Sequence, residues 1–174
     1  MIKNDYEVRA KKFIQDFAPY LKGIRLSHGN KYKVYDAVRR FNVDKKRNVK
    51  VASGASRIAL ITSDYVIKLD LGTTWAGNCK SEMLEYLSAQ QRGFEHLLAK
   101  ITHYKYKNRN FYIMPKATVA ENLTFRTQRK LFDSLSDEER EYLRENIQDI
   151  HNANWGSLNG KFIVIDYAWN CFRN

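Results

Sequence analysis

The sequence predicts an α+β protein, and three features of the chain indicate this class. Two segments near the start have the apolar spacing of amphipathic helices, short β-branched runs follow in the middle, and helix signals return in the last third. Helices and strands thus occupy separate stretches, which is typical of α+β proteins. With 174 residues, the chain is long enough for one domain, or for one domain with an appended helical segment.

Two helices are expected near the N-terminus. Residues 5–21 place apolar side chains on one side with Lys and Arg between them, and a glycine follows as a stop signal. A shorter helix is expected over residues 31–41. The charged run 44–47 is the best linker candidate in the chain. We therefore predict a basic helical N-terminal segment, residues 1–47, and a separate domain, residues 48–174.

The rest of the chain is predicted to contain one antiparallel meander followed by mixed elements. Short β-branched runs separated by Ser-Gly and Ser-Asp indicate the meander, and a Ser-x-x-Glu capping box at Ser136 indicates a later helix. The expected elements are strands 49–52, 57–62 and 65–70, a helix 78–91, strands 98–106 and 110–114, the helix after Ser136, and a final strand 161–165.

Basic residues are concentrated near the N-terminus. Residues 1–50 contain 14 Lys/Arg and 5 Asp/Glu, a net charge of +9, whereas residues 51–174 contain 16 and 14, a net charge of +2. This asymmetry indicates an acidic protein or a nucleic acid as partner of residues 1–50, or else a solvated surface that keeps the protein soluble. Five aromatic side chains among these charges could stack on bases, although their helical spacing also fits a core: Tyr6, Phe13, Tyr20, Tyr32 and Tyr35.

Several classes of protein are disfavoured by composition. Cys79 and Cys171 are far apart and match no zinc-ligand spacing, so reduced thiols are expected. The first residues lack the apolar stretch of a secretory signal, and no apolar run has the length of a membrane span. We expect a cytoplasmic protein with no membrane partner.

Five polar residues occur in an order typical of phosphoryl-transfer chemistry. Lys68 lies on the third expected strand, and Glu82 lies on the helix that follows. Asp149 stands five residues before Asn154, and Asp166 ends the last apolar strand. A strand lysine can neutralise phosphates, a helix glutamate can hold that lysine, and amide and carboxylate oxygens suit Mg²⁺. Each residue alone also has a structural explanation, such as solvated surface charge, helix capping or a turn.

In these residues and their order the sequence resembles the protein-kinase-like superfamily. It looks most like the small bacterial and phage members related to aminoglycoside and choline kinases, whose catalytic loop reads Asp-x-His-x-x-Asn, as residues 149–154 do. The resemblance covers about residues 48–169. It implies a minimal kinase-like fold, with an antiparallel N-lobe sheet carrying one helix and a reduced helical C-lobe, preceded here by the basic helical segment.

The resemblance implies a catalytic role for three residues and metal binding for two. Lys68 would bind the phosphates of ATP, and Glu82 would hold it, with Glu85 as the alternative partner one turn along. Asp149 would be the catalytic base. Asn154 and Asp166 would bind Mg²⁺, whereas the nearby His151 is expected to be structural.

The resemblance also implies residues that contact the nucleotide and shows departures from the family. Gly54 and Ser56 would lie in the loop over the phosphates, and Met114 and Lys116 in the hinge that meets the adenine. That loop has one glycine where protein kinases have several, Asp-Tyr-Ala replaces Asp-Phe-Gly, and only eight residues follow Asp166. We therefore expect no activation segment and no large C-terminal lobe.

Two functions are compatible with these residues. The first is an ATP- and Mg²⁺-dependent phosphotransferase with an unidentified acceptor, of the kind a phage would use in the host cytoplasm against host machinery; the presence of all five polar residues favours it slightly. The alternative is a weakly active or inactive kinase-fold inhibitor, of phage type, that binds a host complex or a CRISPR- or restriction-like nucleic-acid complex through its basic surface. The missing platform for a protein substrate favours this alternative.

Overall fold

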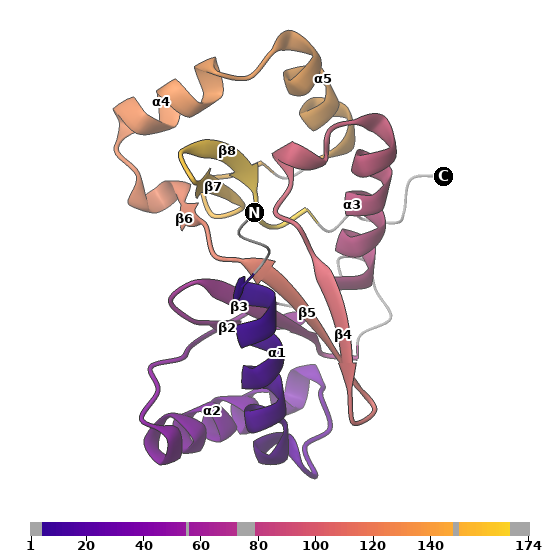
Figure 1. Ribbon diagram of the computed structural model, residues 1–174, viewed down its shortest axis with the longest axis vertical. Coiled ribbons are helices and arrows are strands. Elements are labelled where there is room, and N and C mark those ends of the chain that lie inside the picture. The colour runs from indigo at the N-terminus through magenta and orange to yellow at the C-terminus, as the bar shows by residue number, and fades with distance from the viewer. Residues whose placement is uncertain (1–4, 55, 73–78, 148–149, 168–174) are drawn as a thin grey trace. The chain divides into compact units, whose positions relative to one another are not determined.

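The computed structural model describes residues 5–54, 56–72, 79–147 and 150–167 (Figure 1). Within these residues it has five α-helices, an antiparallel sheet of five strands and a second sheet of three strands, so the α+β class is confirmed. The chain forms two compact units. Unit 1 comprises Met1–Cys79 and Thr102–Lys116, and unit 2 comprises Lys80–Ile101 and Ala117–Asn174. The division between the units therefore does not fall at the predicted boundary after residue 47.

Helix α1, Asp5–Phe17, follows the predicted amphipathic segment. Its buried residues are spaced by three and four, as one face of a helix requires: Ala10, Phe13, Ile14 and Phe17. Two acidic residues in the first turn lie where the helix dipole favours negative charge. Pro19 cannot continue the α-helix, because it lacks an N–H and its ring clashes with the preceding turn, and the chain tightens into the 3-10 turn η1, Ala18–Leu21.

Helix α2, Lys31–Lys45, is longer than predicted, and the linker predicted over 44–47 is wrong. The helix continues through the first half of that run, and Lys46 then ends it in the left-handed conformation, with φ 50°. Asn42 fixes the chain beyond this end. Its side chain donates to the Val49 carbonyl over 2.9 Å and accepts from the Val49 N–H over 3.1 Å. The charged run is therefore a helix end held against the start of the sheet.

The five-stranded sheet has the order β1-β2-β3-β5-β4, and every neighbouring pair is antiparallel. Its strands are β1 (Lys50–Ser53), β2 (Arg57–Ile61), β3 (Tyr65–Asp70), β4 (Thr102–Tyr106) and β5 (Arg109–Pro115). The predicted strands are confirmed, with β4 beginning four residues later than expected. Lys107 and Asn108 both have positive φ, as a two-residue hairpin turn between β4 and β5 needs.

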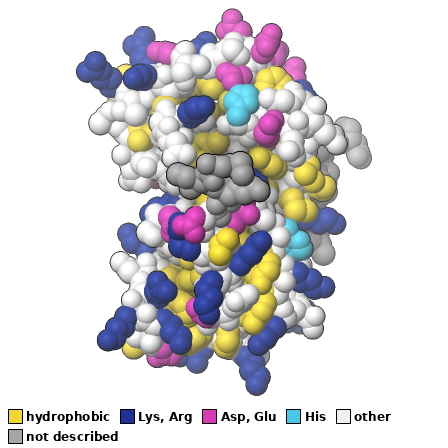
Figure 2. All heavy atoms as spheres, in the orientation of Figure 1, with side chains coloured by type: hydrophobic (Ala, Val, Ile, Leu, Met, Phe, Trp, Pro, Cys, Tyr) yellow, Lys and Arg dark blue, Asp and Glu magenta, His cyan; other side chains and the backbone are white. Residues whose placement is uncertain are grey.

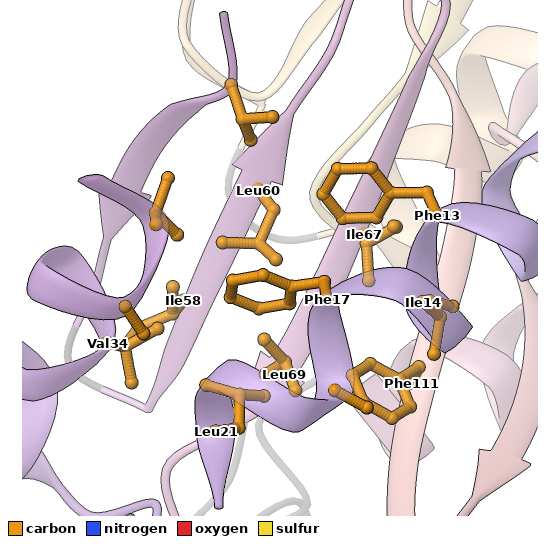
Figure 3. Close-up of a cluster of buried hydrophobic side chains, with 14 of the residues drawn as sticks. Phe13, Ile14, Phe17, Leu21, Val34, Ile58, Leu60, Ile67, Leu69 and Phe111 are labelled. Carbon is orange, nitrogen blue, oxygen red and sulfur yellow. The ribbon is translucent and has the colours of Figure 1, made fainter. Parts of the chain in front are cut away.

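The core of unit 1 lies between this sheet and the two N-terminal helices. Alternate strand residues point to one face, where Ile58, Leu60, Ile67, Leu69 and Phe111 meet side chains from α1 and α2 (Figure 3). Four aromatic rings pack edge to face or stacked within the helical layer: Phe13, Phe17, Tyr20 and Phe41. Residues 5–45 thus form one hydrophobic core with the sheet.

Unit 2 combines helices with the small sheet, which has the order β6-β7-β8. Its elements are α3 (Cys79–Arg92, counted from Lys80 in this unit), η3 (Glu95–Leu97), β6 (Thr118–Val119), η4 (Ala120–Asn122), α4 (Phe125–Asp133), α5 (Asp137–Asn146), β7 (Trp155–Leu158) and β8 (Lys161–Val164). Both hydrogen bonds of the Ser136 capping box are present, so that prediction is confirmed. Helix α4 and strands β6 and β7 were not predicted. No helix in the described stretches is long and apolar enough to cross a membrane.

Candidate functional site

Lys68 lies on the face of the large sheet opposite to the hydrophobic core. It is central in β3, between Ile67 and Leu69, whose side chains enter the core, so the alternation of the strand directs Lys68 the other way. Its register partners on that face are Ala59 of β2 and Tyr112 of β5. Lys68 is only 8% exposed, which excludes the alternative that it is an ordinary solvated lysine.

The same face of the sheet is polar in other positions. Asp70, two residues along β3, accepts a hydrogen bond from the backbone N–H of Cys79 over 2.8 Å. Burial, followed by the charges of Asp70 and Cys79, raises the pKa of Tyr112 to about 12. A lysine and a tyrosine hydroxyl are therefore held on one side of the sheet, and the apolar core on the other.

In unit 2, Glu82 lies in the first turn of α3 with no exposed surface, and its Oε1 accepts from the backbone N–H of Tyr167 over 3.4 Å. Glu85, the alternative considered from the sequence, has a different partner, because its Oε1 accepts from the Tyr142 hydroxyl over 2.9 Å. Glu82 is therefore the acidic residue that contacts the backbone directly after Asp166.

Asn154 and Asp166 are joined through their backbones. The carbonyl of Asn154 accepts from the N–H of Ile165 over 2.8 Å and from the N–H of Asp166 over 3.2 Å. This link holds the turn before β7 against the segment that follows β8. An amide and a carboxylate are thus carried on two chain segments that are fixed to one another, whereas only the order of these residues was known from the sequence.

Tyr167 anchors the segment that carries Asp166. Its hydroxyl donates to the Ala99 carbonyl over 2.5 Å, and the N–H of Ala99 in turn donates to the Val164 carbonyl at the end of β8 over 2.8 Å. Burial, and after it the negative charge of Glu82, raises the pKa of Tyr167 well above its usual value. The hydroxyl therefore stays protonated and keeps donating.

Close backbone packing completes this part of unit 2. Gly156 in β7 pairs with Val119 of β6, and a Cβ at position 156 would lie 2.1 Å from the Thr118 carbonyl oxygen. Only glycine fits at this distance. Asn159 and Gly160 then form the two-residue turn to β8, both with positive φ.

The residues expected around the nucleotide have the following positions in unit 1. Gly54 is exposed in the turn between β1 and β2, where its N–H donates to the Arg57 carbonyl over 2.9 Å, and the Ser56 carbonyl accepts from Leu71. Met114 is buried in β5. The N–H of Lys116 donates to the Asp64 carbonyl over 3.0 Å, so this N–H is already occupied within the protein. Nucleotide contact by these residues stays a prediction.

Asp149 lies outside the described residues, and its role as base stays a prediction. The structural alternative that Asn154 caps a helix end is excluded, since α5 ends at Asn146 and residues 152–154 form a turn. In that turn His151 has a structural contact, because its ring Nδ1 accepts from the Ala153 N–H. Among the described residues, no three His, Cys, Asp or Glu side chains are grouped to hold a metal ion.

Lys68 belongs to unit 1, whereas Glu82, Asn154 and Asp166 belong to unit 2. The structure thus brings the last three together, and the pairing of Lys68 with Glu82 stays a prediction. Comparison of the chain with protein-family models, curated proteins and solved structures found no match.

Tyr167 and Gly156 are the residues of this site that sequence reasoning missed. The Asn-Gly pair at 159–160, followed by an apolar run, was a usable signal, because it is the strongest short-range sign of a β-hairpin. It would have placed a strand before residue 159 and the glycine within it. The contact between Tyr167 and Ala99 left no pattern in the sequence, because the two residues are far apart along the chain.

Proposed function

We propose that the chain is a kinase-like phosphotransferase that binds ATP together with Mg²⁺. The observation that carries the proposal is the backbone link between Asn154 and Asp166, with Glu82 bonded to the residue after Asp166. In protein kinases the metal ions are held by an asparagine that follows the catalytic aspartate and by an aspartate after a later strand, while a glutamate holds the phosphate lysine. The three residues here have the same types and order.

The order of the elements in the larger sheet also supports the proposal. Lys68 is on the third strand, α3 follows it in the chain, and β5 lies between β3 and β4. The lysine face of the sheet is separate from the face that α1 and α2 cover, so phosphate binding at Lys68 would not involve the hydrophobic core.

The roles of the chain's own residues follow from their chemistry. The Asn154 amide oxygen and the Asp166 carboxylate are hard ligands of the kind Mg²⁺ prefers, and their shared backbone link keeps them in place. The metal would neutralise phosphate charge when bound. Lys68 would bind phosphate oxygens, Glu82 would orient Lys68, and Asp149 would accept the proton of the attacking hydroxyl.

Calorimetric titration with ATP, with and without Mg²⁺, tests the binding part of the proposal. We expect Mg²⁺-dependent binding of ATP. Asp166→Asn should weaken this binding by at least about tenfold, because even mutation of a residue that only supports a metal ligand typically lowers metal affinity by about that factor. Asp133→Asn is the matched control, since Asp133 is an exposed aspartate at the end of α4. Absence of any nucleotide effect at millimolar ATP would contradict the proposal.

The transfer part is tested separately with Asp149→Asn. This variant should retain ATP binding but lose phosphoryl transfer, whether to itself or to water, by roughly 10²–10⁴-fold, because a general base acts on the acceptor and not on the nucleotide. Unchanged transfer in this variant would remove the base role. If the wild type binds ATP and transfers nothing, the nucleotide-binding inhibitor is the better description.

A further inference from the structure

A groove with a volume of about 1010 Å³ lies in unit 1. It runs between α1, the segment 46–50 that follows α2, and the turn 61–65 between β2 and β3. All the residues that line it belong to unit 1. Glu82, Asn154 and Asp166 belong to unit 2 and are not among the residues that line it.

The groove is positively charged. Six basic and two acidic side chains line it, for a net charge of +4: Arg9, Lys12, Lys46, Arg47, Lys50 and Lys116, with Asp16 and Asp64. Arg9 is paired with Asp64, and Lys12 is paired with Asp16. The other four cations form no ion pair with any described residue. The free charge of the groove is thus entirely positive and comes from residues 46–50 and Lys116.

These cations stand on a fixed backbone. Lys46 caps α2 in the left-handed conformation, and the two hydrogen bonds between Asn42 and Val49 close the loop around residues 46–48. Arg9, which also lines the groove, joins α1 to the β2–β3 turn through Asp64. A preordered site loses little conformational entropy when a partner binds.

An apolar strip accompanies the charge. Val8 on α1 is 67% exposed although it lines the groove, and Ile61 at the end of β2 is half-buried. Around α1 and α2, Figure 2 shows Lys and Arg as the commonest charged side chains, with apolar surface between them. An exposed valine beside four unpaired cations suits a ligand with both apolar and negative groups.

Two observations argue that this ligand is a peptide and not a nucleic acid. The aromatic rings that line the groove are at most 7% exposed, so they offer no surface on which bases could stack: Phe13, Phe41 and Tyr65. Asp16 and Asp64 also line the groove, where they neutralise Lys12 and Arg9 and leave only four cations for a phosphate backbone. A peptide can avoid both carboxylates by the spacing of its own charges.

We propose that this groove binds an acidic segment of a partner protein, with the segment's apolar side chains placed against Val8 and Ile61. Carboxylates of the segment pair with Lys46, Arg47, Lys50 and Lys116. The groove shares only Lys116 with the candidate nucleotide site and none of the expected phosphate or metal ligands, so binding here occurs with or without ATP.

The test measures fluorescence anisotropy with the full chain, in low salt and without nucleotide. The probes are labelled peptides that repeat Glu-Glu-Leu-Leu or Glu-Glu-Ser-Ser, and a labelled oligothymidylate. We expect the leucine peptide to bind more tightly than the serine peptide. Lys46→Glu/Arg47→Glu/Lys50→Glu should weaken leucine-peptide binding by at least about tenfold, since each pair contributes up to about a factor of five.

The matched control is Lys22→Glu/Lys33→Glu/Lys105→Glu, which has the same net charge and changes three exposed lysines of unit 1 outside the groove. It should change leucine-peptide affinity by less than about threefold. Val8→Ser should weaken binding of the leucine peptide and leave the serine peptide unaffected.

Three outcomes overturn the proposal. If the two triple variants lose affinity for the leucine peptide equally, the peptide is attracted by the overall positive charge of the protein and not by the groove. Tighter binding of the oligothymidylate, weakened by the groove variant, identifies the ligand as nucleic acid. No binding of the leucine peptide at low salt excludes the site. Thermal unfolding of each variant confirms that it is folded, so a loss of binding reports on the surface.

Discussion

Unit 1 carries 20 Lys/Arg and 7 Asp/Glu, a net charge of +13, whereas unit 2 carries 10 Lys/Arg and 12 Asp/Glu, a net charge of −2. The basic character first noticed in residues 1–50 therefore belongs to a whole unit, including strands β4 and β5. Much of the negative charge of unit 2 is on α5, and Figure 2 shows acidic side chains gathered in the region of that helix. Charge in this chain follows the three-dimensional units and not the sequence boundary at residue 47.

The interiors of the two units differ as well. Unit 1 has one continuous apolar cluster that joins both N-terminal helices to the sheet. Unit 2 buries polar groups near its small sheet, with Glu82 and the Tyr167 hydroxyl both removed from solvent and hydrogen-bonded. Buried polar groups of this kind cost stability unless they are paired, and they are common at sites that carry chemistry. Unit 1 therefore carries the proposed partner surface and the buried Lys68, whereas unit 2 carries Glu82 and the proposed metal ligands Asn154 and Asp166.

The largest effect is expected from breaking the core of unit 1. Phe17 has no exposed surface and packs on Phe41, so Phe17→Ala should lower the free energy of unfolding by about 3–5 kcal/mol. Phe125→Ala is the control, because Phe125 is 79% exposed, and its effect should stay within about 0.5 kcal/mol. Urea unfolding followed by tryptophan fluorescence and circular dichroism measures both. Similar small losses in the two variants would show that residues 5–45 are only loosely attached to the sheet.

Most of the elements could be predicted from the sequence, because local signals determine them. The apolar spacing in α1, the β-branched runs of β2 and β3, and the Ser136 capping box all act within a few residues. What could not be predicted was the attachment of the N-terminal helices. The apolar faces of α1 and α2 predict that another element packs against them. They do not identify that element as the sheet face that carries Ile67.

For the candidate site, residue types and order could be predicted but not the bonds between residues. The link from Asn154 to Asp166 uses backbone groups, which every residue has, so no side-chain pattern could have indicated it. The preference for Glu82 over Glu85 rested on position alone. The structure separates them physically, because Glu82 meets the backbone after Asp166 and Glu85 meets Tyr142.

Tyr167→Phe is expected to lower the free energy of unfolding by an intermediate amount. The variant also tests whether the segment of unit 2 that carries Asp166 contributes to metal binding. The variant leaves the Ala99 carbonyl without its donor, at a cost of about 1–3 kcal/mol. Tyr142→Phe is a matched control, since Tyr142 is equally buried and loses a hydrogen bond to Glu85. Both should be destabilised by similar amounts. Under the proposed function, only Tyr167→Phe should also weaken Mg²⁺-dependent ATP binding, because it loosens the segment that carries Asp166. Equal ATP affinity in the two variants would assign Tyr167 a purely structural role.

The smallest expected effect is a pH-dependent change in the free energy of unfolding, which comes from the acidic helix α5 of unit 2. Glu139 closes the capping box of α5 and lies 2.6 Å from His96 Nε2. Burial alone would raise the pKa of Glu139, but the hydrogen bonds and charge of His96 and the Ser136 N–H outweigh it, and the pKa is lowered. A carboxyl whose pKa is lowered on folding stabilises the protein above its unfolded pKa, which is about 4.3. That contribution is lost as the pH falls through the lower folded value.

Glu139→Gln keeps an acceptor for the Ser136 N–H but cannot titrate. We expect Glu139→Gln to lower the free energy of unfolding by less than about 1 kcal/mol near neutral pH. In acid the wild type loses the contribution of the Glu139 carboxylate and the variant does not, so the difference in stability between them should shrink as the pH falls below about 4. Glu138→Gln, in the same exposed first turn, is the control for the loss of one charge near the helix N-terminus. Urea midpoints measured across this pH range compare the two variants. Parallel profiles would mean that the helix dipole alone accounts for the effect, and that the contact between Glu139 and His96 adds nothing to the stability of unit 2.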